Sequence, residues 1–352
     1  KAKLCRYLCF LHGRKEDSMV TIKDVAKKAG VSPSTVSRAL SGNGTVKDST
    51  RQKVLEAVKL LNYRPNFLAQ GLKEGRTKTV GLIIPNIRNP IYPAVARGVE
   101  DAARKFGYTV ILCNTDENVK AEKDYINKLR KRWVDGIILS PASNDTEHIL
   151  ELQKENFPFV IIVRNVDFQA NAVLIDNYRA AYDAVSFLIK TGHRRIAIVK
   201  GNQQLSLYRE RFRGYQQALL DAGIPIYEEL IAGDDSDSVQ WSLDGYNAIN
   251  GLLMQKVKFD AVFATTDLRA IGAIRAIKDH GFKVPEDISV IGFDNLEFSS
   301  LIDPPLSTVS QPLYEIGMRA VNKLIPLIDN KNVIEPTTEI MVSELIIRKS
   351  TR

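Results

Sequence analysis

From Thr79 onward, the chain alternates short apolar runs with segments whose apolar residues recur every three or four positions. The runs are rich in Val and Ile and predict strands, while the segments between them, such as residues 95–106, predict amphipathic helices. The expected strands are residues 80–84, 108–113, 136–140, 159–163, 195–199, 261–264 and 288–293. Such alternation indicates an α/β fold with parallel sheets covered on both faces.

These strands form two series, one ending near residue 163 and one beginning near residue 195. Two series in about 270 residues predict two doubly wound lobes with a cleft between them. Ligands of such sheets bind outside the carboxyl ends of the strands, so we expect a binding site in the cleft.

The chain before residue 79 has a helical pattern instead. Thr21-Ile-Lys-Asp24 resembles a capping box and predicts a helix to about Ala29. Ser32 is the expected N-cap of a second helix, with Pro33 at its first position, and a third helix is expected over residues 48–61. Three short helices with a glycine turn between the first two predict an all-α helix-turn-helix headpiece.

We therefore expect a disordered extension or artefact over residues 1–18 and a helix-turn-helix DNA-binding domain over residues 19–64. Residues 65–78 are expected to form a hinge helix and linker, and residues 79–352 a two-lobed effector-binding and dimerisation domain. Pro65 ends the third helix, and the hinge segment is too short to be a stable helix alone, so we expect it to fold only when something holds it.

Charge is concentrated in the headpiece. The whole chain carries +8, and residues 19–79 alone hold 12 Lys and Arg against 4 Asp and Glu. The remainder from residue 80 is mildly acidic. A short basic module on a neutral body is the electrostatic pattern of a DNA-binding protein.

Other classes of function find little support in the sequence. Three cysteines, Cys5, Cys9 and Cys113, are too few for a disulfide framework and fit a reducing cytoplasm. A metal site at Cys5, Cys9 and His12 would lack a fourth ligand. Apolar runs of about 20 residues, signal-peptide features and the GxSxG, GxxxxGK and GxGxxG motifs are missing. We expect a cytoplasmic, nucleoid-associated protein with no membrane segment, metal, cofactor or catalytic residues.

The second headpiece helix has the composition of a recognition helix. Its apolar residues Val36 and Leu40 are expected to pack inward. On the other side, short hydroxyls suit close approach to phosphates and sugars, and an arginine can pair with guanine. The residues concerned are Ser34, Thr35, Ser37 and Arg38.

The stretch TIKDVAKKAGVSPSTVSRALSGNGTVKDSTRQKVLEAVKLLNYRPNFLAQGLKEGRT resembles the headpiece of the LacI/GalR family of bacterial transcription regulators. The resemblance extends from Val20 through the chain, because the rest is similar to that family's two-lobed core, which is like periplasmic sugar-binding proteins. It implies that Ser34 and Arg38 read bases and that Ala69 and Leu72 of the hinge enter the minor groove, where leucines wedge between base steps. The phosphate contacts implied are Thr21, Ser32, Thr35, Ser37, Asn43, Tyr63 and Asn66.

The resemblance also implies effector-binding positions in the core, expected at strand ends around the cleft. They are Asn89, Tyr92, Arg164, Arg211, Asp294 and Gln311. Asn89 would bind a hydroxyl, Tyr92 a sugar face, and Asp294 two hydroxyls. Two departures are Val163, where some sugar binders have Asp, and Thr266, where many have Asn.

The resulting hypothesis is a homodimeric transcriptional repressor that binds a roughly palindromic double-stranded operator and answers to a carbohydrate-like effector. A dimer is expected because the chain ends at LIIRKSTR without trailing leucine heptads. Three alternatives remain open: a solute-binding protein of the periplasmic class, a Rossmann-like enzyme, and a catabolite regulator that answers to a phosphorylated carrier protein.

Overall fold

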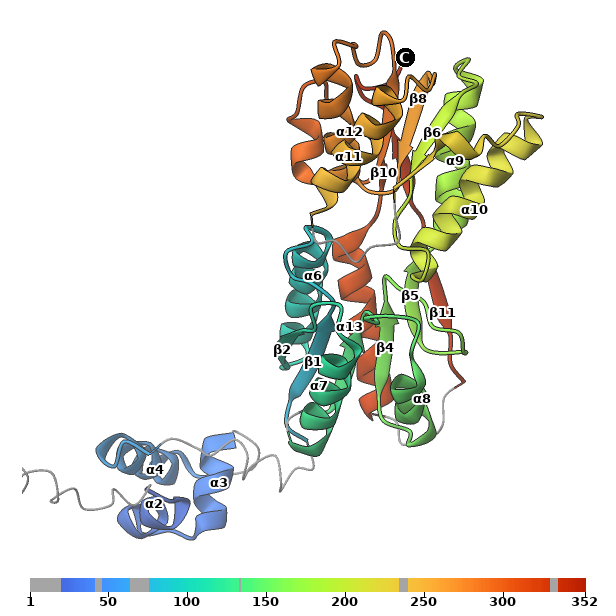
Figure 1. Ribbon diagram of the computed structural model, residues 1–352. Coiled ribbons are helices and arrows are strands. Elements are labelled where there is room, and N and C mark those ends of the chain that lie inside the picture. The colour runs from blue at the N-terminus through green and yellow to red at the C-terminus, as the bar shows by residue number, and fades with distance from the viewer. Residues whose placement is uncertain (1–19, 42–45, 64–75, 133, 234–239, 330–334) are drawn as a thin grey trace, which may run out of the picture. The chain divides into compact units, whose positions relative to one another are not determined.

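The computed structural model describes residues 20–41, 46–63, 76–132, 134–233, 240–329 and 335–352. The chain divides into two compact units, residues 1–77 and residues 78–352, which Figure 1 shows as the blue helical headpiece and the larger core.

The described part of the first unit folds into three helices, α2 (Ile22–Ala29), α3 (Pro33–Ser41) and α4 (Asp48–Leu60). Gly30 lies between the first two at φ 67°, a left-handed conformation that glycine adopts at no steric cost. The helices enclose one small core, made of Val25, Ala26, Val36, Ala39, Val54 and Ala57. The expected helix-turn-helix arrangement is confirmed, and Val36 is buried as predicted.

The second unit has two lobes, and the first of them, here called the N-lobe, is built on a parallel sheet of order β11-β5-β4-β3-β1-β2. Its strands are β1 (Thr79–Ile84), β2 (Thr109–Asn114), β3 (Gly136–Leu139), β4 (Phe159–Ile162), β5 (Ala172–Ile175) and β11 (Thr338–Met341). The covering helices are α6 (Ile91–Lys105), α7 (Val119–Arg132), α8 (Glu147–Lys154) and α13 (Leu313–Asp329). Leu82 packs on the α6 and α13 side and Ile83 on the α7 and α8 side, so both faces are buried.

The second lobe, the C-lobe, has a sheet of order β12-β10-β9-β8-β6-β7, in which only β12 runs antiparallel to its neighbour. Its strands are β6 (Ile196–Val199), β7 (Ile231–Ala232), β8 (Ala261–Ala264), β9 (Ser289–Asp294), β10 (Ser307–Ser310) and β12 (Glu344–Ile346). The helices are α9 (Asn177–Lys190), α10 (Ser206–Asp221), α11 (Trp241–Met254) and α12 (Asp267–Asp279), with 3₁₀ turns at Glu228–Leu230 and Glu297–Ser300. Ile198 faces α9 and α10, and Val199 faces α11 and α12.

The chain passes between the lobes three times, as Figure 1 shows. It leaves the N-lobe after β5, returns from β10 to α13, and leaves again between β11 and β12. Neither lobe is therefore a continuous stretch of sequence, and α13, late in the chain, packs on strands β3, β4 and β5 of the N-lobe.

Helix pairs within each lobe approach closely through glycine. A Cβ added at Gly98 of α6 would meet the carbonyl oxygen of Tyr314 in α13, and one at Gly317 would meet that of Val95. Gly245 and Gly272 place α11 against α12 in the same reciprocal way. Backbone-to-backbone packing of this kind leaves little freedom for the helices to slide within a lobe.

The α/β fold with a helical headpiece and two doubly wound lobes agrees with the prediction from sequence, and each expected strand is present to within a residue or so at its ends. Strands β5, β7, β10, β11 and β12 were not predicted. In the part of the chain that the structure describes, no helix combines the length and the apolar character needed to cross a bilayer.

Candidate functional site: the cleft and the headpiece surface

A small polar cavity lies between the lobes. Its walls are Asn89, Ile91, Tyr92, Val163 and Arg164 from the N-lobe and Leu207, Tyr208, Arg211, Thr266 and Asp294 from the C-lobe. The cavity measures only about 10 Å³, about the space one water needs. A larger ligand therefore requires the lobes or the lining side chains to move apart.

Arg211 anchors the C-lobe wall. It lies within α10, is 2% exposed, and its guanidinium carbon lies 3.5 Å from the centroid of the Phe293 ring. Its Nε donates to Asn177 Oδ1 at 2.9 Å and its Nη1 to the Thr265 carbonyl at 2.6 Å. Burial lowers the pKa of Arg211, although the nearby Asp294 opposes that shift.

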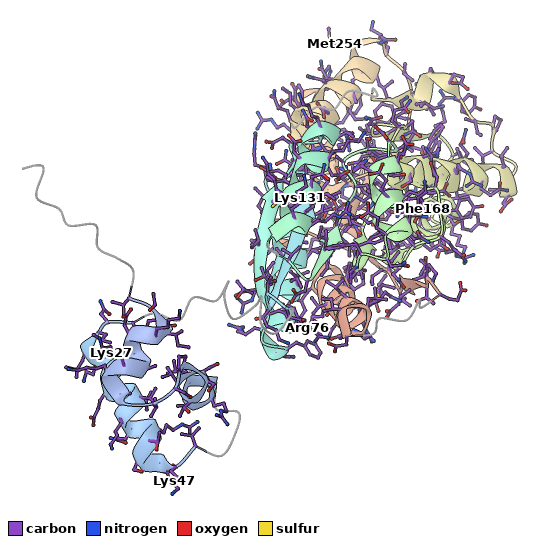
Figure 2. All side chains as sticks on the ribbon, turned by 90° about the horizontal axis from the view of Figure 1, so that it is seen from below. Lys27, Lys47, Arg76, Lys131, Phe168 and Met254 are labelled. Carbon is purple, nitrogen blue, oxygen red and sulfur yellow. The ribbon has the colours of Figure 1, made fainter. Side chains whose placement is uncertain are left out.

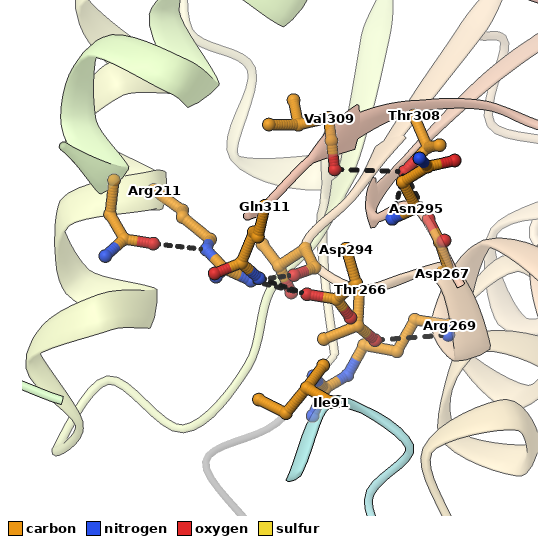
Figure 3. A network of polar contacts seen from close by, with 12 residues as sticks. Ile91, Arg211, Thr266, Asp267, Arg269, Asp294, Asn295, Thr308, Val309 and Gln311 are labelled. Carbon is orange, nitrogen blue, oxygen red and sulfur yellow. Dashed lines mark hydrogen bonds and ion pairs between the residues drawn. The ribbon is translucent and has the colours of Figure 1, made fainter. Parts of the chain in front are cut away.

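Asp294 is the last residue of β9 and has an unusual backbone, with φ 128°. Its Oδ1 accepts a hydrogen bond from Gln311 Nε2 at 2.6 Å (Figure 3). Burial raises the pKa of Asp294 to about 7; the Arg211 charge works against this shift, and Asp267 adds to it. Strained backbone and a perturbed pKa in a cleft are typical of a functional position.

Arg164 and Tyr92 form the N-lobe wall. Arg164 makes a two-contact ion pair with Glu117, at 2.6 and 2.9 Å, and also donates to the Pro141 carbonyl at 2.9 Å. Tyr92 shares a hydrogen bond of 3.0 Å with Ser140 Oγ, and burial raises its pKa to about 12. Both groups are fixed in place before any ligand enters.

Val163, which precedes Arg164, adopts φ 63°. That region is strongly disfavoured for a β-branched residue and far better tolerated by Asp or Asn. The Asp that some sugar binders have at this position fits this backbone without the strain that Val163 carries.

The six expected effector residues gather in one region, but not all at strand ends. That expectation is wrong for Arg211, which lies inside α10, and for Tyr92, the second residue of α6. Gln311 is not among the residues that line the cavity and instead donates a hydrogen bond to Asp294. Both Arg211 and Tyr92 lie in the first two turns of their helices, and those N-terminal turns contribute to the cavity walls.

Several groups that complete the network were missed from sequence. They are Ser140, Asn177, Tyr208, Thr265 and the Glu117 partner of Arg164. Glu117 comes from the loop after β2, and no local pattern pairs it with Arg164, 47 positions away. Of these residues, only Tyr208 could have been predicted from the sequence, because it lies one turn before Arg211 on α10.

The headpiece presents a polar surface on α3. Ser34 and Arg38 are exposed, while Thr35 and Ser37 are half-buried. Ser32 Oγ accepts from the Thr35 backbone N–H at 3.2 Å, as expected of an N-cap, and also shares hydrogen bonds with the hydroxyls of Ser34 and Thr35. This network orders the hydroxyls at the start of the helix.

Two further expected phosphate contacts, Thr21 and Tyr63, lie at the start of α2 and after α4. The Thr21 hydroxyl and backbone N–H both donate to the Asp24 carboxylate, and Tyr63 is half-buried against the headpiece core. Asn43, Asn66, Ala69 and Leu72 lie outside the described residues. Figure 2 shows Lys27 and Lys47 as two of the exposed cations of this unit.

Among the described residues, no group of three or more His, Cys, Asp or Glu side chains is arranged to hold a metal ion. The cavity walls instead offer guanidinium, amide, phenol and carboxyl groups, which bind hydroxyls and anions.

A helical DNA-binding headpiece joined to a two-lobed core with a polar cleft defines the class of ligand-binding transcription regulators. The profile for "Bacterial regulatory proteins, lacI family" matches residues 21–66, and the profile for "Periplasmic binding proteins and sugar binding domain of LacI family" matches residues 77–348. The chain belongs to the LacI family and is a DNA-binding transcription regulator.

Similar proteins support this assignment. Catabolite control protein A of Priestia megaterium is 39% identical over 95% of this chain and 99% of its own length. The structure of the Lac repressor dimer bound to operator and the anti-inducer ONPF is 28% identical, with a TM-score of 0.84 over 94% of this chain and 99% of that one. A complex of the transcriptional regulator CelR with cellobiose is 31% identical, with a TM-score of 0.71 over the same shares.

Proposed function

We propose that this regulator is a homodimeric repressor whose affinity for a roughly palindromic operator is controlled by a small hydroxyl-bearing effector in the cleft. The observation that carries the proposal is that polar groups from both lobes, Arg164 and Tyr92 on one side and Arg211 and Asp294 on the other, line a single cavity. A ligand held by both lobes binds one lobe arrangement better than another, which is the physical requirement for control.

On the DNA side, the proposed base contacts are Ser34 and Arg38, and Ala69 and Leu72 are proposed to enter the central minor groove. The exposure of Ser34 and Arg38 on α3 supports the first assignment. The proposed phosphate contacts are Thr21, Ser32, Thr35, Ser37, Asn43, Tyr63 and Asn66. Residues 65–78 are proposed to act as a hinge, through which a change in the angle between the lobes alters DNA binding by the headpiece. As a bacterial transcription regulator, the protein is proposed to act in the cytoplasm, without a cofactor and without catalysis.

The experiment that tests the proposal is a binding-site selection from random duplexes, followed by an operator titration with and without candidate effectors. We expect a palindromic consensus and an operator affinity that a cleft ligand changes. If no sequence preference emerges, or if ligands that protect the core against heat leave operator affinity unchanged, the proposal is wrong.

A second candidate is a catabolite regulator that answers to a phosphorylated carrier protein. One observation favours it: the 39% identity with catabolite control protein A over 95% of this chain. Such a regulator would gain operator affinity from the carrier protein, which the same titration measures.

A further inference from the structure

Arg269 is a buried cation at the cleft that the effector residues above do not include. It is the third residue of α12 and is 4% exposed. Its backbone N–H donates to Thr266 Oγ1 at 3.3 Å, but its side-chain Nη1 is buried without a hydrogen-bond partner among the described residues. No carboxylate of the described chain lies within ion-pair distance of it.

The guanidinium of Arg269 lies beside Tyr208, a residue that lines the cavity, although Arg269 is not itself one of the lining residues. Its central carbon is 5.0 Å from the centroid of the Tyr208 ring, and that of Arg211 is 5.8 Å from the same ring. Tyr208 itself lines the cavity. Figure 3 shows the Arg269 side chain extending from the start of α12 toward Ile91, a cavity residue of the N-lobe.

The three buried arginines near the cavity differ in their ion-pair partners. Arg164 is matched by Glu117, and Arg211 has Asp294 at 3.9 Å, but Arg269 has no such partner. The charge of Arg269 is also felt by Arg211, because the pKa of Arg211, lowered mainly by burial, is lowered further by the charge of Arg269. The buried carboxylate Asp267 also acts on Arg211, but it accepts hydrogen bonds from Leu296, Ser299 and Thr308 and forms no ion pair with Arg269.

A buried guanidinium without a counter-charge is unfavourable, since burial removes its hydration and the Tyr208 ring replaces only part of it. An apolar side chain of similar length would fill the same space without that cost. The charge at this position gains a counter-charge when the cleft holds an anion, and guanidinium binds carboxylate and phosphate groups through two parallel hydrogen bonds.

We propose that the cleft takes a small hydroxyl-bearing molecule that carries a carboxylate or phosphate group, and that Arg269 binds this anionic group beside Tyr208. Asn89 and Asp294 then bind the hydroxyls. This inference rests on the proposed function only in assuming that the effector lies in this cleft.

The test compares the full-length protein with Arg269→Met and with a control on the same helix, Arg275→Met, whose side chain is 73% exposed and paired with Asp279. The probes are inorganic phosphate and sulfate, followed by glucose, glucuronate and glucose 6-phosphate, at matched ionic strength. Melting temperature and isothermal titration report binding, and operator affinity reports control.

We expect phosphate to raise the melting temperature of the wild type and of Arg275→Met but not that of Arg269→Met. At least one anionic sugar should bind at least tenfold more tightly than glucose, and Arg269→Met should remove that preference. Without a ligand, Arg269→Met should melt at the same temperature as the wild type or higher, because it removes an unpaired buried charge. Glucuronate and glucose 6-phosphate distinguish a carboxylate ligand from a phosphate ligand.

Equal protection by phosphate in wild type and Arg269→Met would overturn the inference, as would a neutral sugar that binds as tightly as its anionic counterparts. If a neutral sugar alone changes operator affinity, the proposed function stands and the inference is wrong. If anion binding depends on Arg269 but no ligand changes operator affinity, the inference stands and the proposed control of DNA binding is wrong.

Discussion

Arg211 Nη1 and Asp294 Oδ1 lie 3.9 Å apart, which is beyond hydrogen-bond distance. Arg211 Nη1 instead donates to the Thr265 carbonyl, and Asp294 Oδ1 accepts from Gln311. The Arg211 charge therefore lowers the pKa of Asp294 less than burial raises it, and the net value is about 7. The carboxyl changes its ionisation state near neutral pH, where a regulator in a cell works.

Effector binding is accordingly expected to depend on pH. Ligand hydroxyls donate to the ionised form of Asp294, so affinity should rise with pH and level off above about 7, with a loss of about tenfold per pH unit below that. Isothermal titration in two buffers of different ionisation enthalpy should detect one proton released per site at pH 6. Asp294→Asn should bind weakly and with a flat profile; a profile that stays steep in this variant would assign the pH dependence to another group.

Stability of the ligand-free protein should change in the opposite direction. Because the folded pKa of Asp294 is raised above its ordinary value of 3.8, the folded state retains a proton that the unfolded chain has released. The contribution of Asp294 to the free energy of unfolding should therefore decrease as pH rises from about 4 to about 7. Comparing denaturant midpoints of wild type and Asp294→Asn at pH 5 and pH 8 isolates this effect from that of other groups.

Glu117→Gln tests how Arg164 is held. Removing one partner of a buried ion pair leaves the other charge uncompensated, which costs about 3 kcal/mol of unfolding free energy or somewhat less at a partly exposed site. We expect a loss of about 2 kcal/mol in chemical denaturation, most of it recovered in Glu117→Gln with Arg164→Met. If the double variant is no more stable than the single one, Arg164 is stabilised mainly by the carbonyls of residues 141 and 142.

Gly98→Ala should destabilise the N-lobe, because the added methyl would meet the carbonyl oxygen of Tyr314, which the backbone of α13 holds in place. Overpacking of this kind costs about 1–3 kcal/mol. Gly251→Ala, in the open on α11, is the matched control and should instead stabilise by about 0.5–1 kcal/mol. Thermal unfolding of both variants measures the difference in stability. Equal changes in melting temperature would show that α6 and α13 move apart enough to accommodate the added methyl group.

Arg38→Ala should weaken operator binding by about 1–3 kcal/mol and relax the base preference at one position of each half-site. Its exposed place on α3 makes a large effect on folding unexpected. Fluorescence anisotropy with the selected operator and a scrambled duplex distinguishes a base contact from a phosphate contact. A loss of equal size on both duplexes would assign Arg38 to a phosphate.

Leu72→Ser should leave the core fold and effector binding intact while weakening operator binding at least several-fold, because a serine cannot act as an apolar wedge between base steps. Unchanged affinity for the selected operator would mean that Leu72 does not enter the minor groove.

The sequence was informative wherever a local pattern reflects burial. Strands such as β8, buried on both faces, form continuous apolar runs and were predicted. β10 reads STVS and was missed, because the polar residues Ser307 and Thr308 are buried with hydrogen-bond partners from distant segments, as Ser350 Oγ accepts from the Ser307 backbone N–H. β11 and β12 are short edge strands with polar residues, and their pairing depends on chain segments far away in sequence.

The same reasoning applies to the cleft. Asp294 ends an obvious strand and its position was predictable, whereas Arg269 was not predicted, although it has the helical spacing of Ala273 and Ile277 on the buried face of α12. The periodicity of α12 thus indicates a buried position, but the Tyr208 ring beside the guanidinium comes from α10, 61 positions away, and could not be read from local sequence.

The threefold passage of the chain between the lobes has a consequence for biosynthesis. The headpiece needs only contacts among residues 22–63, so it can fold soon after those residues leave the ribosome. The N-lobe lacks α13 and β11, and the C-lobe lacks β12, until the last 40 residues have been made. During translation, the headpiece is thus complete well before the ligand-binding core. A chain truncated before α13 would have a folded headpiece without a complete ligand-binding core.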